Sequence, residues 1–315
     1  MNRKVFLFIA LLLGLTVQSF AQGTSGELPG IVLRTPIGAR AAGMGEAFVS
    51  VADDATALFY NPGGLHQLKG VSFSGSYSSI PTSGNPFYGG LTISGKKFGT
   101  LGVMYKAIDI AGLDGGIVPF SANYHDGETV LSVSYGQRFL YFFGVGGSVK
   151  YVNNPAVKFS PSLLGYDIGA HFRLGHDGFP INLGAGAVVR DFATRVVVDA
   201  SEVENPITED VPSTINVGVH AKLDIQVVSV LVAASHQQTG HGVYQDYELR
   251  EDITQYNLGT EIWLGEGLAL RAGQAGEDYH FGASLQLPAL RLDYAHIPDR
   301  VGENGLHKFG FIFNF

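Results

Sequence analysis

The sequence contains no cysteine, and charged residues make up only 15% of its 315 residues, against about 25% in an ordinary soluble protein. Without cysteine the chain cannot form a disulfide, a thiolate metal site or a cysteine nucleophile. The formal net charge of −8 argues against general nucleic-acid binding. The sequence also lacks any run of about 18 apolar residues, which excludes a helical membrane protein.

Glycine and aromatic residues, in contrast, are abundant. The chain holds 43 Gly, 21 Phe and 14 Tyr, and its mean hydropathy is +0.16. This many aromatic residues argues against intrinsic disorder. A chain that is rich in glycine and aromatics and poor in charge is typical of membrane β structure.

The first 21 residues predict a secretory signal peptide. Arg3 and Lys4 precede an apolar run over 5–17, and small residues lead to an expected cleavage after Ala21. The alternative is a membrane anchor, but the run is too short to cross a hydrocarbon core of about 30 Å comfortably. We therefore expect the mature chain to be exported.

From residue 69 onward, apolar and polar residues alternate with a period of two. Leu290, Leu292 and Tyr294, for example, alternate with Arg291 and Asp293, and successive side chains of a strand point to opposite faces. The pattern predicts an all-β fold, a single 14-stranded antiparallel transmembrane β-barrel over 69–315. The predicted strands are 69–80, 86–94, 98–109, 128–139, 141–153, 163–174, 180–191, 213–224, 226–237, 254–264, 267–275, 278–287, 289–298 and 305–315.

The predicted connections are short after even-numbered strands and mostly longer after odd-numbered strands. This parity is the arrangement of bacterial outer-membrane barrels, whereas a soluble β-sandwich, the alternative, has no reason to show it. We therefore expect a bacterial outer-membrane location with both termini periplasmic and the long loops extracellular. Those loops carry sixteen acidic and four basic residues, which predicts affinity for divalent cations or a basic partner. The ranges counted are 110–127, 154–162, 191–212, 238–253, 274–278 and 299–304.

The alternation also assigns an inward face with nine basic and three acidic residues. These are Lys106, Arg138, Lys150, Arg173, Arg190, Lys222, Arg271, Arg291 and Lys308, with Asp167, Glu261 and Asp293. We expect Glu261 to pair with Arg271, and Asp293 with a neighbouring cation. Inward glycines leave room for something to pack closely against the wall. They are Gly144, Gly146, Gly169, Gly184, Gly186, Gly218, Gly259, Gly273, Gly282 and Gly310.

Residues 22–68 show no strand alternation and predict an N-terminal hatch inside the lumen. A short helix is expected near 54–60, with Asp53 or Asp54 capping its start and Asn61, Pro62 and Gly63 ending it. A capped helix outside the barrel is the alternative. Inside the lumen, Glu46, Asp53 and Asp54 would meet the basic face of the wall.

The last predicted strand places Phe309, Phe311, Phe313 and Phe315 on one face. A terminal aromatic residue on a last strand resembles the recognition signal for outer-membrane barrel assembly. The barrel-assembly machinery is therefore an expected partner, contacted through Phe311, Phe313 and Phe315.

The segments 37–48, which include Gly43 and Gly45, and 52–65 closely resemble the N-terminal hatch of the FadL-like superfamily of long-chain fatty-acid transporters. That superfamily also includes the PorV/PorQ-like barrels of type IX secretion. Its Asn-Pro-Ala falls on Asn61-Pro62-Gly63, where glycine keeps the turn and loses a methyl contact. The resemblance implies entry of hydrophobic ligands from outside and sideways exit near the third strand, here 98–109, where Gly99 and Gly102 would permit a bulge.

The resemblance implies passive, hatch-gated passage of small hydrophobic compounds. The alternative is a PorV/PorQ-like, non-transporting barrel that binds or shuttles secreted cargo. An enzyme is not expected, because no histidine pair carries a supporting motif. His236 and His241 show no defensible metal geometry, and no cofactor is expected. The expected partners are outer-membrane lipids, a hydrophobic ligand, and secretion components or cargo.

Overall fold

The barrel wall consists of fourteen antiparallel strands in the part of the chain that the structure describes. The computed structural model describes residues 31–79, 86–95, 97–108, 128–153, 163–175, 180–198, 207–240, 243–244, 247–248, 253–298 and 305–315. The expected signal peptide, 1–21, lies outside these ranges. None of the described helices is long and apolar enough to cross a membrane.

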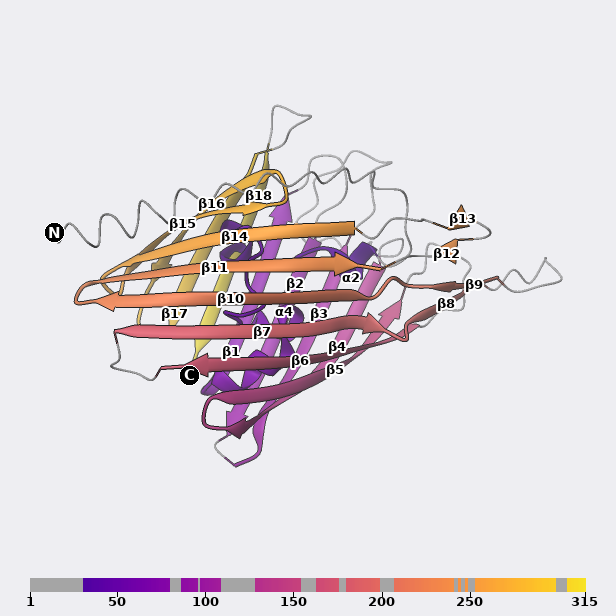
Figure 1. The fold of residues 1–315 in the computed structure, drawn as a ribbon, viewed down its shortest axis with the longest axis horizontal. Helices are drawn as coiled ribbons and strands as arrows, with labels where there is room; N and C mark the ends of the chain where they lie inside the picture. Colours follow the sequence, from indigo (N-terminus) through magenta and orange to yellow (C-terminus); the bar gives the residue numbers. More distant parts are fainter. Residues whose placement is uncertain are drawn as a thin grey trace.

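Each wall strand pairs with its neighbours along the chain, and the first strand closes the barrel on the last (Figure 1). In chain order the wall strands are β1 Gly70–Ser79, β2 Pro86–Gly95, β3 Gly99–Ile108, β4 Glu128–Leu140, β5 Phe143–Asn153, β6 Leu163–Leu174, β7 Ile181–Phe192, β10 Thr214–Ile225, β11 Val228–Thr239, β14 Ile253–Leu264, β15 Leu268–Ala275, β16 Asp278–Gln286, β17 Leu290–Ile297 and β18 Leu306–Asn314. Closure pairs Phe73 with Phe313 and Tyr77 with Phe309. The predicted fold class and strand number are confirmed.

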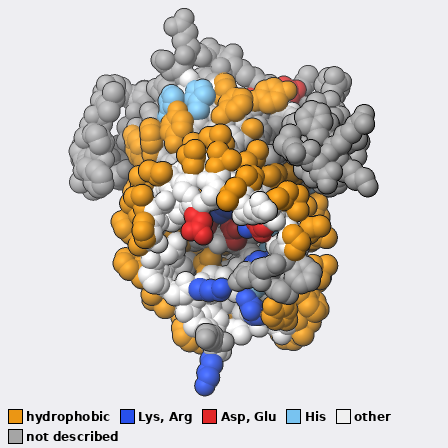
Figure 2. All heavy atoms as spheres, turned by 90° about the vertical axis from the view of Figure 1, so that its left-hand side faces the viewer, with side chains coloured by type: hydrophobic (Ala, Val, Ile, Leu, Met, Phe, Trp, Pro, Cys, Tyr) orange, Lys and Arg blue, Asp and Glu red, His pale blue; other side chains and the backbone are white. Residues whose placement is uncertain are grey.

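Side chains alternate across the wall as the period-two pattern predicts. In β3, Leu101, Val103 and Tyr105 face outward and are 50%, 44% and 42% exposed, while Met104 and Lys106 between them are buried. An exposed apolar outer face with a polar inner face is the arrangement of an outer-membrane-type barrel. Figure 2 shows one end of the barrel, where a ring of apolar side chains surrounds a hollowed mouth that holds acidic and basic side chains.

The two ends of the barrel differ in their connections. At the left of Figure 1, β10 and β11 are joined by a tight turn, and β1 begins beside the end of β18. At the right, two small hairpins extend beyond the wall: β8 Arg195–Val198 with β9 Ile207–Asp210, and β12 Val243–Tyr244 with β13 Tyr247–Glu248. These hairpins occupy segments that the sequence predicts only as long connections.

Residues 31–68, which we call the hatch, lie inside the wall. The hatch contains α2 Ile31–Arg34, α3 Ala39–Gly43, α4 Ala57–Tyr60 and the 3-10 helix η1 Pro62–Gln67. Helix α3 contacts β15 to β18, whereas η1 contacts β4 to β7, so the hatch crosses the lumen from one side of the wall to the other (Figure 1). Its own core includes Met44, Phe48 and Leu58, each with 0% exposure.

The helix that the sequence places near 54–60 is shorter in the structure. It begins at Ala57, with Thr56 at the N-cap position and no side-chain cap. Asp54 instead accepts hydrogen bonds from the backbone N–H and the hydroxyl of Thr56, at 3.0 and 2.5 Å. The predicted capping of this helix by Asp53 or Asp54 is therefore wrong, because the carboxylate of Asp54 forms a turn ahead of the helix.

The third strand is regular rather than bulged. The pairing of β3 with β2 runs from Gly99 to Ile108 and its pairing with β4 from Thr100 to Ile108, without a register shift in the described residues. Shifts occur instead between β4 and β5 near Arg138, and between β6 and β7 near Tyr166. The bulge that Gly99 and Gly102 would permit is thus absent from the described residues of β3.

Candidate functional site

The contact between hatch and wall is the candidate site, and Arg40 is its central charged residue. Arg40 lies in α3 and is 5% exposed. Its guanidinium donates to both oxygens of Glu261 in β14, with Nε–Oε2 and Nη2–Oε1 distances of 2.8 Å. Its Nη1 also donates to Asp53, at 2.5 Å, and to Asp54, at 3.0 Å. One hatch cation therefore joins two hatch carboxylates to the wall.

The wall continues this network across β15 to β17. Arg271 donates to Glu261 at 2.6 Å, and Arg291 donates to Asp293 at 3.0 Å. Arg291 also reaches the hatch, where its Nη2 lies 2.6 Å from Asp54 Oδ2. The structure thus brings Asp54 together with four charged residues of the wall: Glu261, Arg271, Arg291 and Asp293. Such buried ion pairs are held in place by several partners each, because a single unpaired charge here would be costly.

The electrostatics of the hatch residues follow from these neighbours. Burial alone lowers the pKa of Arg40, but the carboxylates of Asp53 and Glu261 outweigh it and raise the pKa well above its ordinary value. Burial alone raises the pKa of Asp54, but Arg291 and Arg40 outweigh it and hold the pKa well below its usual range. Arg40 is therefore charged at neutral pH, and Asp54 keeps its charge in moderately acidic solution.

A second polar contact joins the hatch to β18 and β3. Glu46 accepts a hydrogen bond from the hydroxyl of Tyr60 and lies 3.8 Å from the ammonium of Lys308. Lys308 also donates to the carbonyl of Pro36 at 3.1 Å, and Lys106 donates to the carbonyls of Val32 and Thr35. Wall lysines thus satisfy backbone carbonyls at the start of the hatch.

Two wall cations also enclose a hatch aromatic ring. The Nζ of Lys106 and the guanidinium carbon of Arg190 lie 4.6 and 4.8 Å from the ring centroid of Phe59. Nearby, Lys150 bridges Asp167 and Asp191, with 2.8 and 2.7 Å contacts. The sequence assigns Asp191 to an acidic outer loop, but the residue is 1% exposed inside the wall. The bulge in β7 turns its side chain inward.

The Asn61-Pro62-Gly63 turn holds the hatch against the opposite side of the wall. The amide of Asn61 donates to the carbonyls of Val49 and of Ala170 in β6, at 2.9 and 3.0 Å. Its Oδ1 accepts the N–H of Gly63 at 2.9 Å, and this bond caps η1. A Cβ on Gly63 would lie 2.8 Å from backbone atoms of Ala170. The expected loss of a methyl contact is therefore wrong, because the wall leaves no space for a methyl group.

Inward-facing glycines of the wall lie directly against the hatch. Of the ten glycines predicted to face inward, nine lie so close to hatch atoms that an added Cβ would contact them, and Gly184 is the exception. In the hatch itself, Gly43 and Gly45 leave equally little space, because an added Cβ would meet the backbone of Gly282 and Gln274 of the wall. Gly45 also has a φ of 59°, in the left-handed region where a Cβ is strained.

A histidine pair completes the contact at η1. His66 Nε2 lies 3.1 Å from His171 Nδ1, and His171 Nε2 lies 2.7 Å from the carbonyl of Ser50. Arg138 contributes a hydrogen bond from its Nη2 to the carbonyl of His66, at 3.4 Å. Burial, followed by His171 and the two cations Arg138 and Arg173, lowers the pKa of His66 to about 3.

Other predicted site residues lie apart from this contact. Lys222 pairs with Asp224 at 3.1 Å, and both side chains are 39% exposed. Phe311 and Phe313 pair with β1 at the barrel closure, and Phe315 is 80% exposed. Gly102 does meet the hatch, since a Cβ there would lie 2.2 Å from Leu58 Cδ2. Gly99 begins β3 with a φ of 78°.

Arg40 and His171 are the main residues that the sequence reasoning did not assign. Arg40 stands as the single charge in an Ala- and Gly-rich stretch, a signal for a buried pair. His171 carries no such signal, because it lies among the polar residues on the inward face of β6. In the part of the chain that the structure describes, no group of three or more His, Asp or Glu residues is placed to hold a metal ion.

Comparison with known proteins identifies the fold. No family model and no curated protein sequence matches the chain. Among solved structures, the toluene transporter TbuX from Ralstonia pickettii matches with a TM-score of 0.58 at 13% identity, covering 89% of this chain and 98% of TbuX. The monoaromatic hydrocarbon channel CymD matches with a TM-score of 0.54 at 13% identity, covering 89% and 97%. The toluene transporter TodX from P. putida matches at 0.52 and 12%, covering 89% and 98%. The predicted resemblance to FadL-like barrels is thereby confirmed at the level of the fold.

Proposed function

We propose that this protein is an outer-membrane channel for small hydrophobic compounds and that movement of the hatch gates passive passage. The fold is shared with proteins that carry toluene and other monoaromatic hydrocarbons, at 12–13% identity. The observation that carries the gating is the way in which the hatch is held. It contacts the wall through ion pairs, single hydrogen bonds and glycine surfaces, and these contacts can separate while the strand pairing of the barrel remains intact.

The two sides of the hatch are held differently. Helix α3 and Asp54 are bound to β14 and β17 by ion pairs, and Gly43 and Gly45 on the same side lie against the backbone of the wall. Asn61 and Gly63 lie on the backbone of β6 without an ion pair. When the Arg40 side separates, water solvates the released charges and offsets part of the cost of separation. We therefore assign the moving part of the gate to the side of Arg40 and the fixed part to Asn61, Pro62 and Gly63.

A reversible covalent lock tests this proposal. A Cβ on Gly310 would lie 3.6 Å from Cβ of Ala39, within the range of about 3.5–4.5 Å found in disulfides. The double variant Ala39→Cys/Gly310→Cys therefore tethers α3 to β18, and no native cysteine competes. Toluene uptake is measured in Gram-negative cells that lack a transporter of their own. We expect oxidation to reduce uptake to the level of cells without the protein, and reduction to restore it.

A second cysteine pair serves as the matched control. Ser134 and Ser148 lie on the neighbouring wall strands β4 and β5, with their hydroxyl oxygens 2.8 Å apart. Ser134→Cys/Ser148→Cys forms a bridge within the wall and leaves the hatch free, so uptake should not respond to oxidation. Uptake that ignores the Ala39/Gly310 lock contradicts gating on this side, and uptake no faster than in cells without the protein contradicts transport itself.

We also propose an orientation and a partner for the barrel. The short-turn end, where β1 begins and β18 ends, faces the periplasm, and the barrel-assembly machinery recognises Phe311, Phe313 and Phe315. Protease sites inserted in the 238–253 connection of intact cells check the orientation. A PorV/PorQ-like role with secretion components or cargo stays the alternative prediction, and co-purification of the detergent-extracted protein with such components checks it.

A further inference from the structure

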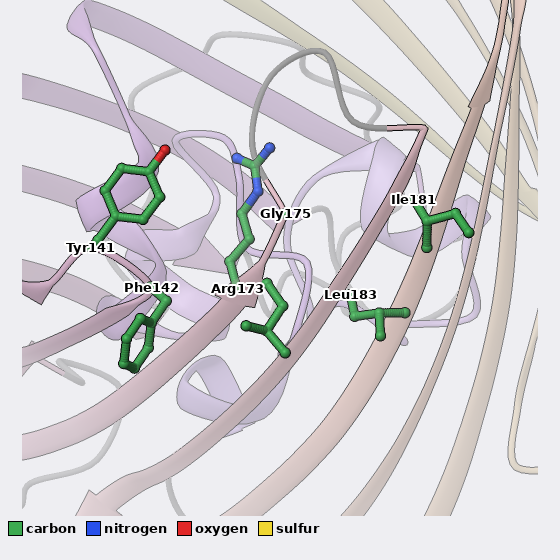
Figure 3. Close-up of a pocket in the computed structure, with 7 residues that line it drawn as sticks. Tyr141, Phe142, Arg173, Gly175, Ile181 and Leu183 are labelled. Atoms are coloured by element: carbon green, nitrogen blue, oxygen red, sulfur yellow. The ribbon is translucent and has the colours of Figure 1, made fainter.

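A groove of about 370 Å³ lies on the outer face of the wall at the short-turn end (Figure 3). Tyr141 and Phe142 of the β4–β5 turn form one side, and Ile181 and Leu183 of β7 form the other side. Leu174, which ends β6, also lines the groove. Arg173 is the charged residue among its lining side chains. The groove is therefore an apolar slot on the outward face of the wall, with the guanidinium of Arg173 at its edge.

The turn beside the groove is apolar along its whole length. Phe139, Leu140, Tyr141 and Phe142 follow one another, and Phe139 and Tyr141 are each 73% exposed. Phe142 is fixed against the wall, because its carbonyl accepts the N–H of Arg173 at 2.8 Å and its ring packs edge-on against Phe172 at 5.2 Å. Aromatic side chains of this kind prefer the level of the lipid headgroups, with the ring in hydrocarbon and the hydroxyl in water.

One cation lies at the edge of the groove. Figure 3 shows the guanidinium of Arg173 extended between Tyr141 and Ile181, on the same side as the hydroxyl of Tyr141. Arg138, three residues before Tyr141, instead faces the hatch, where its Nη2 donates to the carbonyl of His66 at 3.4 Å. A guanidinium carries five N–H donors and matches a phosphate in two-point geometry, so it can bind an additional anion while keeping an existing partner.

We propose that this groove is a binding site for an anionic phospholipid of the leaflet at the short-turn end. One acyl chain lies over Leu174 and Leu183, and the phosphate contacts Arg173. The apolar lining continues the lipid-facing belt of the barrel, which accounts for the chain, and the positive charge at its rim selects an anionic over a zwitterionic headgroup. The site is independent of the proposed transport activity.

The test measures lipid retained by the full-length protein in detergent. Phosphatidylglycerol or phosphatidylethanolamine is added to the delipidated protein, and bound lipid is counted by native mass spectrometry. We expect the wild type to retain phosphatidylglycerol in preference to phosphatidylethanolamine. Leu183→Trp fills the slot and should weaken retention of phosphatidylglycerol by about tenfold, the effect of about 1.4 kcal/mol. Arg173→Gln should remove the preference for the anionic lipid while leaving acyl-chain binding.

Leu285→Trp in β16 is the matched control, because Leu285 and Leu183 are both outward residues, 48% and 47% exposed. All variants are first checked for folding by the heat-dependent shift of barrel mobility on gels. Equal retention in Leu183→Trp and Leu285→Trp overturns the site, and an unchanged lipid preference in Arg173→Gln overturns the headgroup contact. Inorganic phosphate is added in a parallel arm. If phosphate alone displaces the lipid from the wild type, the site binds phosphate and the proposal fails.

Discussion

Arg40 and Glu261, 221 residues apart in sequence, face each other through two parallel hydrogen bonds of 2.8 Å. The planar guanidinium and the planar carboxylate fix distance and orientation together, which a lysine would not do. Because Glu261 is also bound by Arg271 at 2.6 Å, its carboxylate is fixed to the wall. The pair therefore sets a defined position of the hatch against the wall.

Replacement of Arg40 tests this pair. Arg40→Met keeps much of the side-chain volume but leaves the surrounding carboxylates short of a partner, so the free energy of unfolding should fall by about 3 kcal/mol. Urea unfolding in detergent gives the value. Lys222→Met is the matched control, because its partner Asp224 is equally exposed, and its loss should cost no more than about 1 kcal/mol. Equal losses in both variants would contradict a buried, coupled role for Arg40.

Gly63 gives a prediction about the fixed side of the hatch. Gly63→Ala places a methyl group 2.8 Å from the backbone of Ala170, and such overpacking costs about 1–3 kcal/mol. Gly89→Ala in β2 is the control, because its Cβ would have no neighbour closer than 3.8 Å. Thermal unfolding should separate the two variants. A fully stable Gly63→Ala would show that the hatch does not lie on β6 as described.

The stability of the hatch should depend on pH through His66. The docked hatch holds the pKa of His66 near 3, whereas a released histidine has a pKa of about 6.5. The released state therefore binds an extra proton between these values, so docking is strongest above pH 6.5 and weakens as the pH falls toward 3. Asp54 keeps its charge over the upper part of this window, because Arg291 and Arg40 hold its pKa below its ordinary value.

Limited proteolysis of the hatch at pH 7.5 and pH 5 measures this effect. The hatch of the wild-type protein should be cleaved faster at pH 5 than at pH 7.5, after correction for the activity of the protease at each pH. His66→Gln keeps a side-chain amide near His171 and removes the titrating group, so the pH response should shrink. The charged and titrating neighbours His171, Arg138 and Arg173 stay in place in both proteins. If the cleavage rate of His66→Gln changes with pH as much as that of the wild type, a group other than His66 causes the pH dependence.

The contact between Leu58 and Gly102 is suited to a double-mutant cycle. Gly102→Ala forces its methyl group against Leu58, whose Cδ2 would lie 2.2 Å away. Leu58→Ala alone leaves a cavity that costs about 2–5 kcal/mol. In the double variant the new methyl group enters the vacated space, so its stability should exceed the sum of the two single effects by about 1 kcal/mol. Strict additivity would contradict direct packing of the hatch on β3.

The wall was predictable from sequence because each strand carries its own local pattern. The alternation in β3 or β17 can be recognised without knowledge of the partner strand. The even number of strands, and the short connections after even-numbered strands, are further checks that a wrong assignment of strands would fail. The pairing of Glu261 with Arg271 followed from neighbouring strands in the same way.

The contacts of the hatch with the wall could not be predicted from the sequence, because they join residues that lie far apart in the chain. Arg40 binds a residue 221 positions later, and Asn61 binds Ala170, 109 positions later. No local period encodes such contacts. The positions of the bulges could not be read from the sequence for a related reason. Glycine permits a bulge, but in β3 Gly102 accommodates Leu58, whereas the bulge in β7 occurs at Asp191, with a φ of 58° and a buried lysine partner.

Nine inward glycines of the wall lie against the hatch, and at these positions the wall contributes only backbone. The shape of this part of the contact therefore depends mainly on one continuous segment, 31–68. In the channel that we propose, exchange of this segment should change which compounds pass, and a graft of a related hatch onto this wall should transfer its preference.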